Sequence, residues 1–291
     1  MAVLSVERQE AARVVGDRLF DAVVDGGARS PLDPVYLHQA LVGRVGLLIQ
    51  LSSWRVYAGA EEPGRALPAQ PLPTPVPEEA PVQPGPFQQA EESLWRLRSA
   101  SRYPATVLRL GALYGPGIRL AREWYVVDRL RRGRNELVLA DGGGQILHRL
   151  YVDNAVHAVI SALDHPHQAD GGAFNVADSD APTAARLVLG IAATAGRRLQ
   201  IVHLPSEWWP CPHPWACPQP VVLDLYRLRA RLGYQEPIAP VRALEATVRW
   251  LMELADDEAF LTLAPYWERF GACHDLVAEE RALARWHARR L

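Results

Sequence analysis

The sequence predicts an α/β fold in which a parallel sheet is flanked by helices, with a smaller C-terminal substrate lobe and a helical tail. Short apolar runs that end in small or polar residues alternate with segments of helical character. The first unit consists of runs at residues 21–27 (DAVVDGG) and 46–53 (GLLIQLSS), separated by the helix-like residues 31–44. Mostly apolar runs of this length are typical of strands buried on both faces of a parallel sheet.

The same alternation continues through the rest of the chain. Residues 61–86 are rich in proline and show no apolar periodicity, which predicts an irregular loop or lid. The pattern then predicts strands at residues 105–110, 137–141 and 173–176, and helices at residues 88–101, 119–132, 153–163, 182–195, 224–232 and 240–254. We expect a sheet core over residues 1–150, a mixed core and substrate-binding lobe over 151–255, and a charged helical extension over 256–291.

The composition excludes several classes of partner. The chain has 291 residues, 49% of them hydrophobic, and a net charge of −2, which predicts a globular protein with one substantial core. Because no basic excess exists to attract phosphate backbones or acidic lipids, we expect no nucleic-acid and no membrane partner, and a small-molecule substrate instead. The apolar runs are far shorter than the roughly 20 residues that cross a bilayer. A cytoplasmic protein is predicted, and a homodimer is compatible with the sequence.

Two residue types limit the chemistry. The chain has three cysteines, an odd number that argues against a disulfide framework and fits a reducing compartment. It has no lysine, so the combined count of 31 lysines and arginines consists of arginines alone. No step can therefore use a lysine as a base or as a Schiff-base amine, and arginine cannot replace it because the guanidinium stays protonated.

Five motifs occur in a fixed order along the chain. They are SSWRVYAG at residues 52–59, YPATVLRLGALYGPG at 103–117, HRLYVDNAVHAV at 148–159, GGAFNVADSDAPT at 171–183 and LDLYRLRARLGY at 223–234. In order and spacing the chain resembles, over about residues 11–252, the extended short-chain dehydrogenases of the NAD-dependent epimerase/dehydratase family. The resemblance implies a Rossmann-like sheet.

The chain departs from this family at the cofactor-binding turn. Members of the family begin with a strand and a glycine-rich turn whose backbone amides hold the cofactor pyrophosphate. This chain resembles the family only from about its third or fourth strand, and no GxGxxG follows any predicted strand. Gly43 and Gly46 follow a helix, where glycine is an ordinary helix stop. We therefore expect a truncated Rossmann-like core that binds no cofactor.

A second departure concerns the family's general acid/base, a tyrosine four residues before a lysine. The ammonium group lowers the phenol pKa and holds the nicotinamide ribose. The corresponding helix reads PGPFQQAEESL, which places Phe87 at the tyrosine and Glu91 at the lysine. No shift of the alignment restores the pair, because the chain has no lysine. Loss of ordinary nicotinamide-dependent hydride transfer is therefore predicted.

The resemblance also nominates site residues. The candidate catalytic residues are Ser53, Tyr57 and Tyr114, and the candidate substrate-binding residues are Phe87 and Arg149. Trp209 and His213 are further candidate substrate-binding residues, taken from the aromatic, proline-rich sequence at residues 207–220 and not from the resemblance. Each has a plainer alternative. Ser53 could cap its loop, the aromatic residues could pack in the core, and Arg149 could form an ion pair with Asp153 or Asp141 instead of binding a carboxylate or phosphate.

One segment contains metal-ligand residue types. Cys211, His213 and Cys217 lie in a proline-rich, aromatic stretch, and Cys273 with His274 could complete a tetrahedral set. The spacing CxHxxxC matches no standard zinc pattern, so no metal is expected. The tryptophans of this stretch could instead form an apolar wall over the substrate crevice.

Three hypotheses for the function remain open. The first is a cofactor-independent enzyme on a degenerate epimerase/dehydratase scaffold, which converts a small organic molecule by lyase, dehydratase, isomerase or cyclase chemistry in specialised metabolism. The second is a non-catalytic binding or scaffold protein. The third is an NAD(P)-dependent epimerase or reductase whose missing strands are supplied by another chain. A perturbed titratable group in a closed pocket would favour the first, and a crevice filled by Phe87 and tryptophans would favour the second.

The edge of the predicted sheet raises a structural question. In the strand order implied by the resemblance, the strand at residues 21–27 lacks its usual neighbour. Because an open apolar edge promotes aggregation, we expect this edge to be covered by residues 5–15, by the helices beyond residue 256, or by a second copy of the chain.

Overall fold

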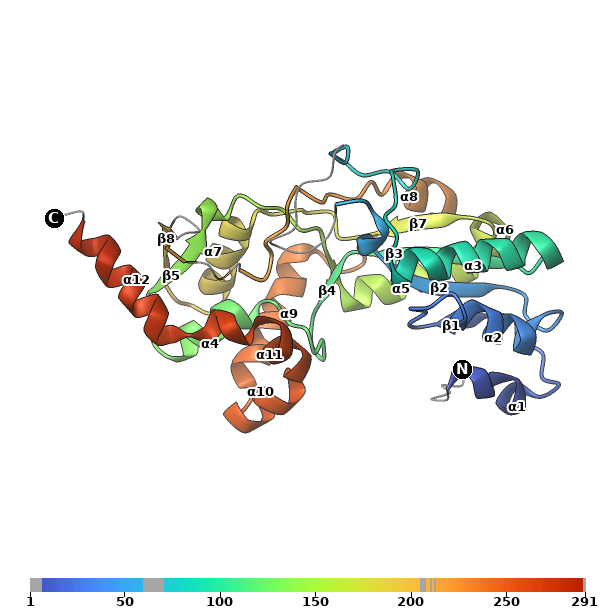
Figure 1. The fold of residues 1–291 in the computed structure, drawn as a ribbon, viewed down its shortest axis with the longest axis horizontal. Helices are drawn as coiled ribbons and strands as arrows, with labels where there is room; N and C mark the ends of the chain where they lie inside the picture. Colours follow the sequence, from blue (N-terminus) through green and yellow to red (C-terminus); the bar gives the residue numbers. More distant parts are fainter. Residues whose placement is uncertain (1–6, 60–70, 205–207, 210, 212, 290–291) are drawn as a thin grey trace.

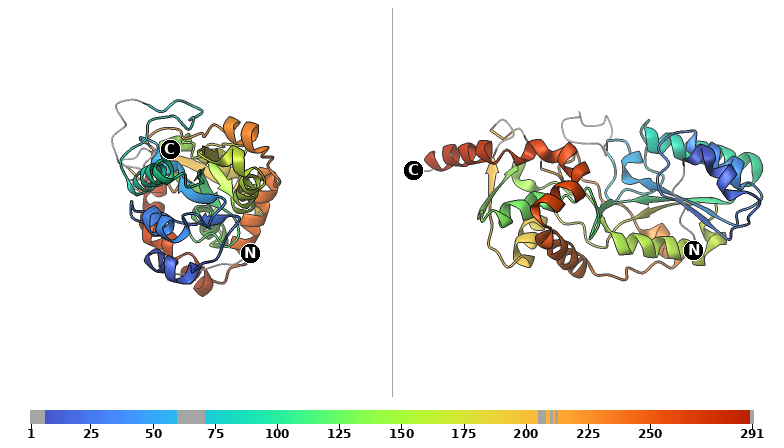
Figure 2. Two further views of the ribbon diagram at one scale, coloured as in Figure 1. Left: turned by 90° about the vertical axis from the view of Figure 1, so that its right-hand side faces the viewer. Right: turned by 90° about the horizontal axis from the view of Figure 1, so that it is seen from below.

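The structure is a computed structural model that describes residues 7–59, 71–204, 208–209, 211 and 213–289. The main sheet has four parallel strands in the order β1 (Val23–Asp25), β2 (Leu48–Ser53), β3 (Ala105–Leu110) and β7 (Ala173–Val176). Helices flank it on both faces (Figures 1 and 2), so the predicted α/β fold is confirmed. Among the described residues, no helix combines the length and apolar character that crossing a bilayer requires.

Alternate residues of the main sheet pack against two different helical layers. Leu48 and Val107 share one apolar cluster with residues of α1 (Ala11–Val15), α2 (Asp33–Leu41) and α3 (Pro86–Ser101). Ile49 and Leu108 point the other way and join α5 (Val152–Asp164), α6 (Pro166–Ala169) and α8 (Tyr226–Leu232). Because both faces are covered, the strands are apolar along most of their length, as the sequence pattern indicated.

The other half of the elongated molecule is built around a second, two-stranded parallel sheet (Figure 1). Its strands are β5 (Glu136–Ala140) and β8 (Gln200–Leu204), and β8 was not predicted from the sequence. A third pair, β4 (Ala112–Tyr114) with β6 (Arg149–Tyr151), is also parallel. The helices of this half are α4 (Trp124–Arg131), α7 (Ala184–Thr194), α9 (Pro240–Glu253), α10 (Asp256–Thr262), α11 (Ala264–Phe270) and α12 (Leu276–Ala288). The two halves interleave along the sequence, and the domain boundaries at residues 150 and 255 stay predictions.

The C-terminal helices do not cover the β1 edge. They lie at the end of the molecule opposite to β1 (Figure 1), where Leu263, Tyr266 and Phe270 join the largest core cluster. The expectation that the helices beyond residue 256 cover the β1 edge is therefore wrong, because these helices bury their apolar side chains in the core of the other half of the molecule. At the other end, α1 packs on α2, and Arg8 reaches the last residue of β1, Asp25, at 2.5 Å.

Side chains cap the outer edge of β7. The backbone N–H of Asn175 donates to Glu78 Oε1 at 2.9 Å, and Arg227 Nη1 donates to the carbonyl of Ala173 at 3.4 Å. The carboxylate Oε2 of Glu78 lies 3.7 Å from Arg227 Nε. These bonds occupy backbone groups that could otherwise pair with the strand of another molecule.

The C-terminal extension is attached to α4 by a fully buried ion pair. Arg129 on α4 and Glu279 on α12 have side chains that are 0% exposed, and their closest charged atoms lie 3.0 Å apart. Arg129 also donates to the carbonyl of Cys273, and Glu279 accepts the backbone N–H of Val138 in β5. The pair therefore joins α12, α4 and the second sheet.

We predict that Glu279→Ala lowers the free energy of unfolding by about 3–5 kcal/mol, because it leaves the Arg129 guanidinium buried without its carboxylate. Glu280→Ala is the matched control: Glu280 is the next residue, is 65% exposed and contacts Arg134 at 2.6 Å. Its loss should cost less than about 1 kcal/mol. Urea denaturation of both variants tests this, and equal, small effects would show that the pair does not hold the extension.

Candidate functional site

Ser53 lies at the carboxyl end of β2, the edge at which open α/β sheets bind ligands. Its Oγ accepts the backbone N–H of Arg55 at 3.3 Å and so caps the short helix η2 (Trp54–Val56). The side chain is half-buried. Ser53 thus has the geometry of the loop cap that the sequence left open as an alternative.

A buried ionic network fills the site beside Ser53. Glu91, at the position that the resemblance assigns to the lysine, receives the guanidinium of Arg109 at 2.7 and 3.1 Å. Ser52, rather than Ser53, donates its hydroxyl to the same carboxylate at 2.5 Å. Both charged side chains are less than a tenth exposed. The carboxylate of Glu91 is therefore fully engaged inside the protein.

Tyr57 is held by the same network. Its phenol donates to Asn175 Oδ1 at 2.6 Å and accepts from Arg109 Nη1 at 3.1 Å. Arg109 also donates to the carbonyl of Glu78 at 2.8 Å. Burial raises the pKa of the Tyr57 phenol, although the charge of Arg109 acts in the opposite direction. A buried phenol with two internal partners is a poor proton donor to a ligand.

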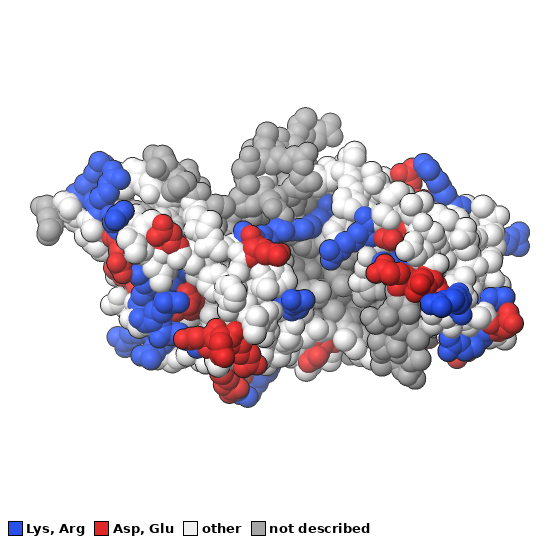
Figure 3. Space-filling model, turned by 60° about the horizontal axis from the view of Figure 1, so that its bottom comes forward, with Lys and Arg blue, Asp and Glu red and all other residues white. Residues whose placement is uncertain are grey.

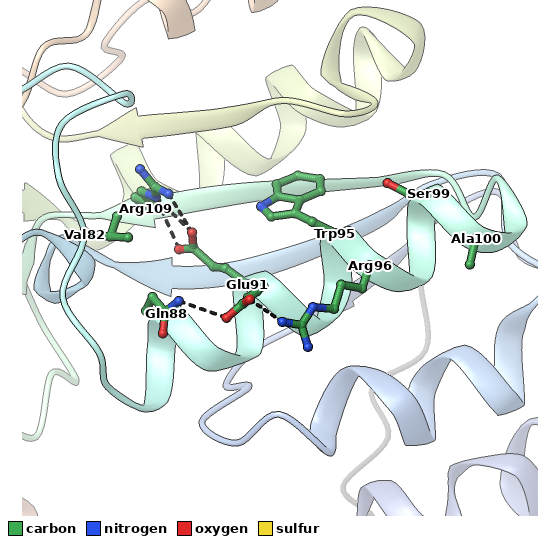
Figure 4. A pocket seen from close by; sticks show the side chains of 9 residues that line it. Val82, Gln88, Glu91, Trp95, Arg96, Ser99, Ala100 and Arg109 are labelled. Atoms are coloured by element: carbon green, nitrogen blue, oxygen red, sulfur yellow. Dashed lines mark hydrogen bonds and ion pairs between the residues drawn. The ribbon is translucent and has the colours of Figure 1, made fainter.

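An open groove of about 770 Å³ runs along α3 beside this network (Figure 4). Glu91 and Arg109 border one end of it, and the indole of Trp95 lies further along the helix. Gln88 and Arg96 both bond to the exposed Glu92. Phe87, in the first turn of α3, is partly buried and packs against the largest core cluster. The apolar ring at the tyrosine position is thus in contact with the core.

Tyr114 and Arg149 belong to a second buried cluster. Tyr114 donates to Asp178 Oδ2 at 2.6 Å, and the guanidinium of Arg149 lies 4.1 Å from the centre of the Tyr114 ring. Arg149 forms its ion pair with Glu123 at 3.2 Å, a partner that was not among those expected from the sequence. Burial raises the pKa of Tyr114 far above its ordinary value. These contacts connect β4, β6 and the loop after β7.

Sequence reasoning missed His148, which precedes Arg149 in the motif HRLYVDN. His148 is buried, its Nδ1 accepts the backbone N–H of Leu223 at 2.9 Å, and its Nε2 lies 2.7 Å from the carbonyl of Asp178. These partners require a neutral imidazole with the proton on Nε2. Burial also lowers the pKa of His148. The position next to a predicted site residue was the available signal.

The aromatic stretch after β8 divides between two environments. Trp209 packs in an apolar cluster with Val138 and with Leu283 of α12. His213 is 1% exposed, and its Nε2 lies 3.1 Å from Gln145 Oε1. His213 Nδ1 has no partner among the described residues, and burial lowers the pKa of His213 to about 4. His213 is therefore neutral at physiological pH.

Cys211, Cys217 and Cys273 form no disulfide within the described residues, and they differ in environment. Cys211 is half-buried and contacts the carbonyl of Ala272 at 3.2 Å, and its hydrogen bond with Cys273 lowers the pKa of Cys211 to about 7. Burial raises the pKa of Cys217 to about 11. Within the described part of the chain, no group of three or more His, Cys, Asp or Glu side chains is arranged to hold a metal ion. His274 instead contacts Asp128 at 3.0 Å.

Comparison with known sequences gives two matches, each to part of the chain. A model of the NAD dependent epimerase/dehydratase family matches residues 36–177. A 3-diazoavenalumate denitrifying reductase from a Streptomyces species is 34% identical over 108 residues, which cover 37% of this chain and only 34% of that protein. The match thus spans about a third of the curated relative.

Comparison with solved structures gives the same fold. Pal from Bacillus thuringiensis superposes with a TM-score of 0.64 at 17% identity, over 86% of this chain and 81% of that one. UDP-glucuronic acid 4-epimerase from Bacillus cereus gives 0.64 at 16% identity, over 84% and 79%. RMD from Pseudomonas aeruginosa gives 0.63 at 21% identity, over 87% and 89%. At these identities the solved structures support the α/β fold, whereas the truncation and the lost motifs stay predictions.

We predict that His213 makes stability fall as the pH is lowered from about 6.5 to about 4. The ring stays neutral in the folded protein to about pH 4, whereas in the unfolded chain it binds a proton near pH 6.5, so acid favours unfolding in this window. His213→Gln should remove part of the loss, on the order of 2–3 kcal/mol. His167→Gln, at an exposed site, should leave the profile unchanged. Identical profiles for wild type and His213→Gln would contradict the prediction.

Proposed function

We propose that this chain binds a small organic molecule on an epimerase/dehydratase scaffold and does not carry out nicotinamide-dependent hydride transfer through a tyrosine-lysine pair. The observation that carries the proposal is the buried bridge between Glu91 and Arg109. It occupies the place that the sequence resemblance gives to the lysine. The family match and the solved structures support the scaffold itself.

The charge of this bridge is wrong for the family's chemistry. A lysine ammonium lowers the pKa of a neighbouring phenol and attracts ribose hydroxyls. Glu91 would instead raise the pKa of such a phenol, and its charge is already balanced by Arg109. Phe87, four residues earlier, has no ionisable group. The described residues therefore do not fit a reacting nicotinamide, and no step of the function is assigned to one.

The geometry favours a binding protein over an enzyme at this site. Tyr57 and Tyr114 each donate to a side chain of the protein, Asn175 and Asp178 respectively. Burial raises the pKa of both phenols, which makes them weak acids at neutral pH. Ser53 acts as a helix cap. The groups nominated for proton transfer are thus committed to holding the scaffold together.

A cofactor-independent enzyme is the second candidate, and Cys211 is the observation that favours it. Its thiol is partly accessible, receives a hydrogen bond from Cys273, and has a pKa of about 7. A thiol of this pKa is about half ionised at neutral pH, and the thiolate is the reactive form for nucleophilic catalysis. For the protein to be such an enzyme, Cys211 would have to act on the bound molecule. We expect either function to operate in the reducing environment of the cytoplasm.

We predict that the purified chain shows no saturable binding of NADH or NADPH in isothermal titration calorimetry at concentrations up to about 1 mM, a weak-binding limit of about 4 kcal/mol. Circular dichroism on the same sample should verify that it is folded. Micromolar binding would overturn the proposed function. Binding that appears only after a second chain is added would instead favour the hypothesis of an NAD(P)-dependent enzyme completed by another chain.

We predict that iodoacetamide modifies Cys211 first, with a rate that reaches half its maximum near pH 7. Cys217, buried and with a pKa of about 11, should react slowly until the protein unfolds. Cys273→Ala is the control, because loss of the hydrogen bond to Cys211 should shift the Cys211 profile upward, toward its ordinary pKa near 9. Peptide mass spectrometry measures each site. If Cys211 shows no preference over Cys217, the enzyme candidate loses its support.

A further inference from the structure

The outer face of α12 carries a stripe of exposed side chains, most of them cationic. The stripe consists of Val277, Arg281, Arg285 and Arg289, which follow one another at four-residue spacing and therefore lie next to one another on the helix surface. None of these arginines forms an ion pair with a carboxylate in the part of the chain that the structure describes. We call these four residues the α12 stripe.

The indole of Trp208 orders two cations of the α12 stripe. The guanidinium carbons of Arg289 and Arg285 lie 4.2 and 5.3 Å from the centre of its ring. Arginines four residues apart on a helix repel one another, so a negatively charged partner would stabilise this arrangement. Side chains that are ordered beforehand also lose less conformational entropy on binding. The α12 stripe is therefore suited to an acidic protein surface.

A surface of the opposite charge lies on α10, in the same half of the molecule. It consists of Asp257 and Glu258 in the first turn and of Phe260 and Leu261, which are 62% and 73% exposed. We call these four residues the α10 face. In Figure 3, basic side chains gather at the upper left and acidic ones at the lower left, in the half that contains α12 and α10 in Figure 1. The positive end of the helix dipole accounts for the acidic residues but not for two exposed apolar ones.

The order of charged and apolar residues on the two helices matches when the helices run antiparallel. Along α12 an apolar residue precedes the arginines, whereas along α10 the acidic residues precede the apolar pair. Val277 and Arg281 are four residues apart, as are Leu261 and Asp257, so each pair spans about 6 Å of helix axis. Antiparallel packing thus brings Leu261 to Val277 and Asp257 to Arg281.

Within one chain this pairing does not form. Figure 1 shows α12 leading away from α10 toward the C-terminus, and the residues of both surfaces are exposed. The helix that α10 contacts is α11. A second copy of the chain carries the same two surfaces, so two protomers related by a two-fold axis make the contact twice.

We infer that the α12 stripe of one protomer binds the α10 face of a second copy, and that two such contacts hold a homodimer. The inference is independent of the proposed function. Exposed ion pairs add little affinity, so the apolar residues supply most of the binding energy, whereas the charges set the orientation and the choice of partner. Because short helix faces form a small interface, we expect a dissociation constant in the micromolar range.

The test is sedimentation velocity on the full chain from about 1 to about 100 μM at low salt. We expect the mass to rise toward that of two copies, and added sodium chloride to weaken association by screening. Arg281→Glu and Asp257→Arg should each raise the dissociation constant at least about tenfold, because each places like charges opposite one another.

Mixing these two variants supplies a test that no loss of folding can imitate. In a dimer of one Arg281→Glu chain and one Asp257→Arg chain, both contacts again join opposite charges. We therefore expect the mixture to dimerise within about threefold of the wild-type dissociation constant, although neither variant does so alone. Arg197→Glu is the control: it makes the same charge change at an exposed residue outside both surfaces and should dimerise like the wild type.

Three results would overturn the inference. The first is a monomeric mass for the wild type at about 100 μM and low salt. The second is wild-type association of Arg281→Glu or of Asp257→Arg alone, which would place the interface on another surface. The third is a mixture of the two variants that stays monomeric, because the two side chains would then not face each other. Circular dichroism of each variant should match the wild type, since both residues are exposed.

Discussion

The buried charge of Arg109 is the constraint on which the main sheet and its site depend. Arginine cannot lose its proton in a protein, so a guanidinium on the central strand β3 must be neutralised and its donors satisfied where it lies. Glu91 supplies the charge, and Tyr57 with the carbonyl of Glu78 supplies acceptors. Through these bonds, Arg109 holds three segments in position against the sheet: helix α3, the turn after β2 and the segment that caps β7.

The same constraint explains why a site on this scaffold can lose its chemistry without losing its fold. A lysine in place of Glu91 would put two cations side by side in the interior, at a cost of several kcal/mol in a medium of low polarity. The carboxylate removes that conflict and accepts a hydrogen bond from Ser52 as well. The replacement is therefore stable in itself, and the phenol of Tyr57 becomes part of the packing.

Local pattern was enough to predict the strands of the main sheet, because both of their faces are buried. The strands at residues 105–110 and 173–176 have the predicted bounds, whereas β8 was missed because two of its five residues, Gln200 and His203, are exposed and polar. The site was less predictable. Glu91 could be placed by resemblance, but its partner Arg109 lies 18 residues away on another element, and no pattern in one sequence reveals such a pairing. The location of the C-terminal helices depended in the same way on Arg129 meeting Glu279, 150 residues later.

The buried arginines differ in the partners that the fold gives them. Arg109, Arg129 and Arg149 each have a carboxylate within 3.2 Å, so their charges are balanced by the fold. Arg122 is also buried, but among the described residues its Nε donates to a backbone carbonyl, that of Pro214, and no carboxylate forms an ion pair with it. A carbonyl dipole does not balance a full charge, so keeping the Arg122 guanidinium in the interior costs more free energy than keeping the three that are paired with carboxylates.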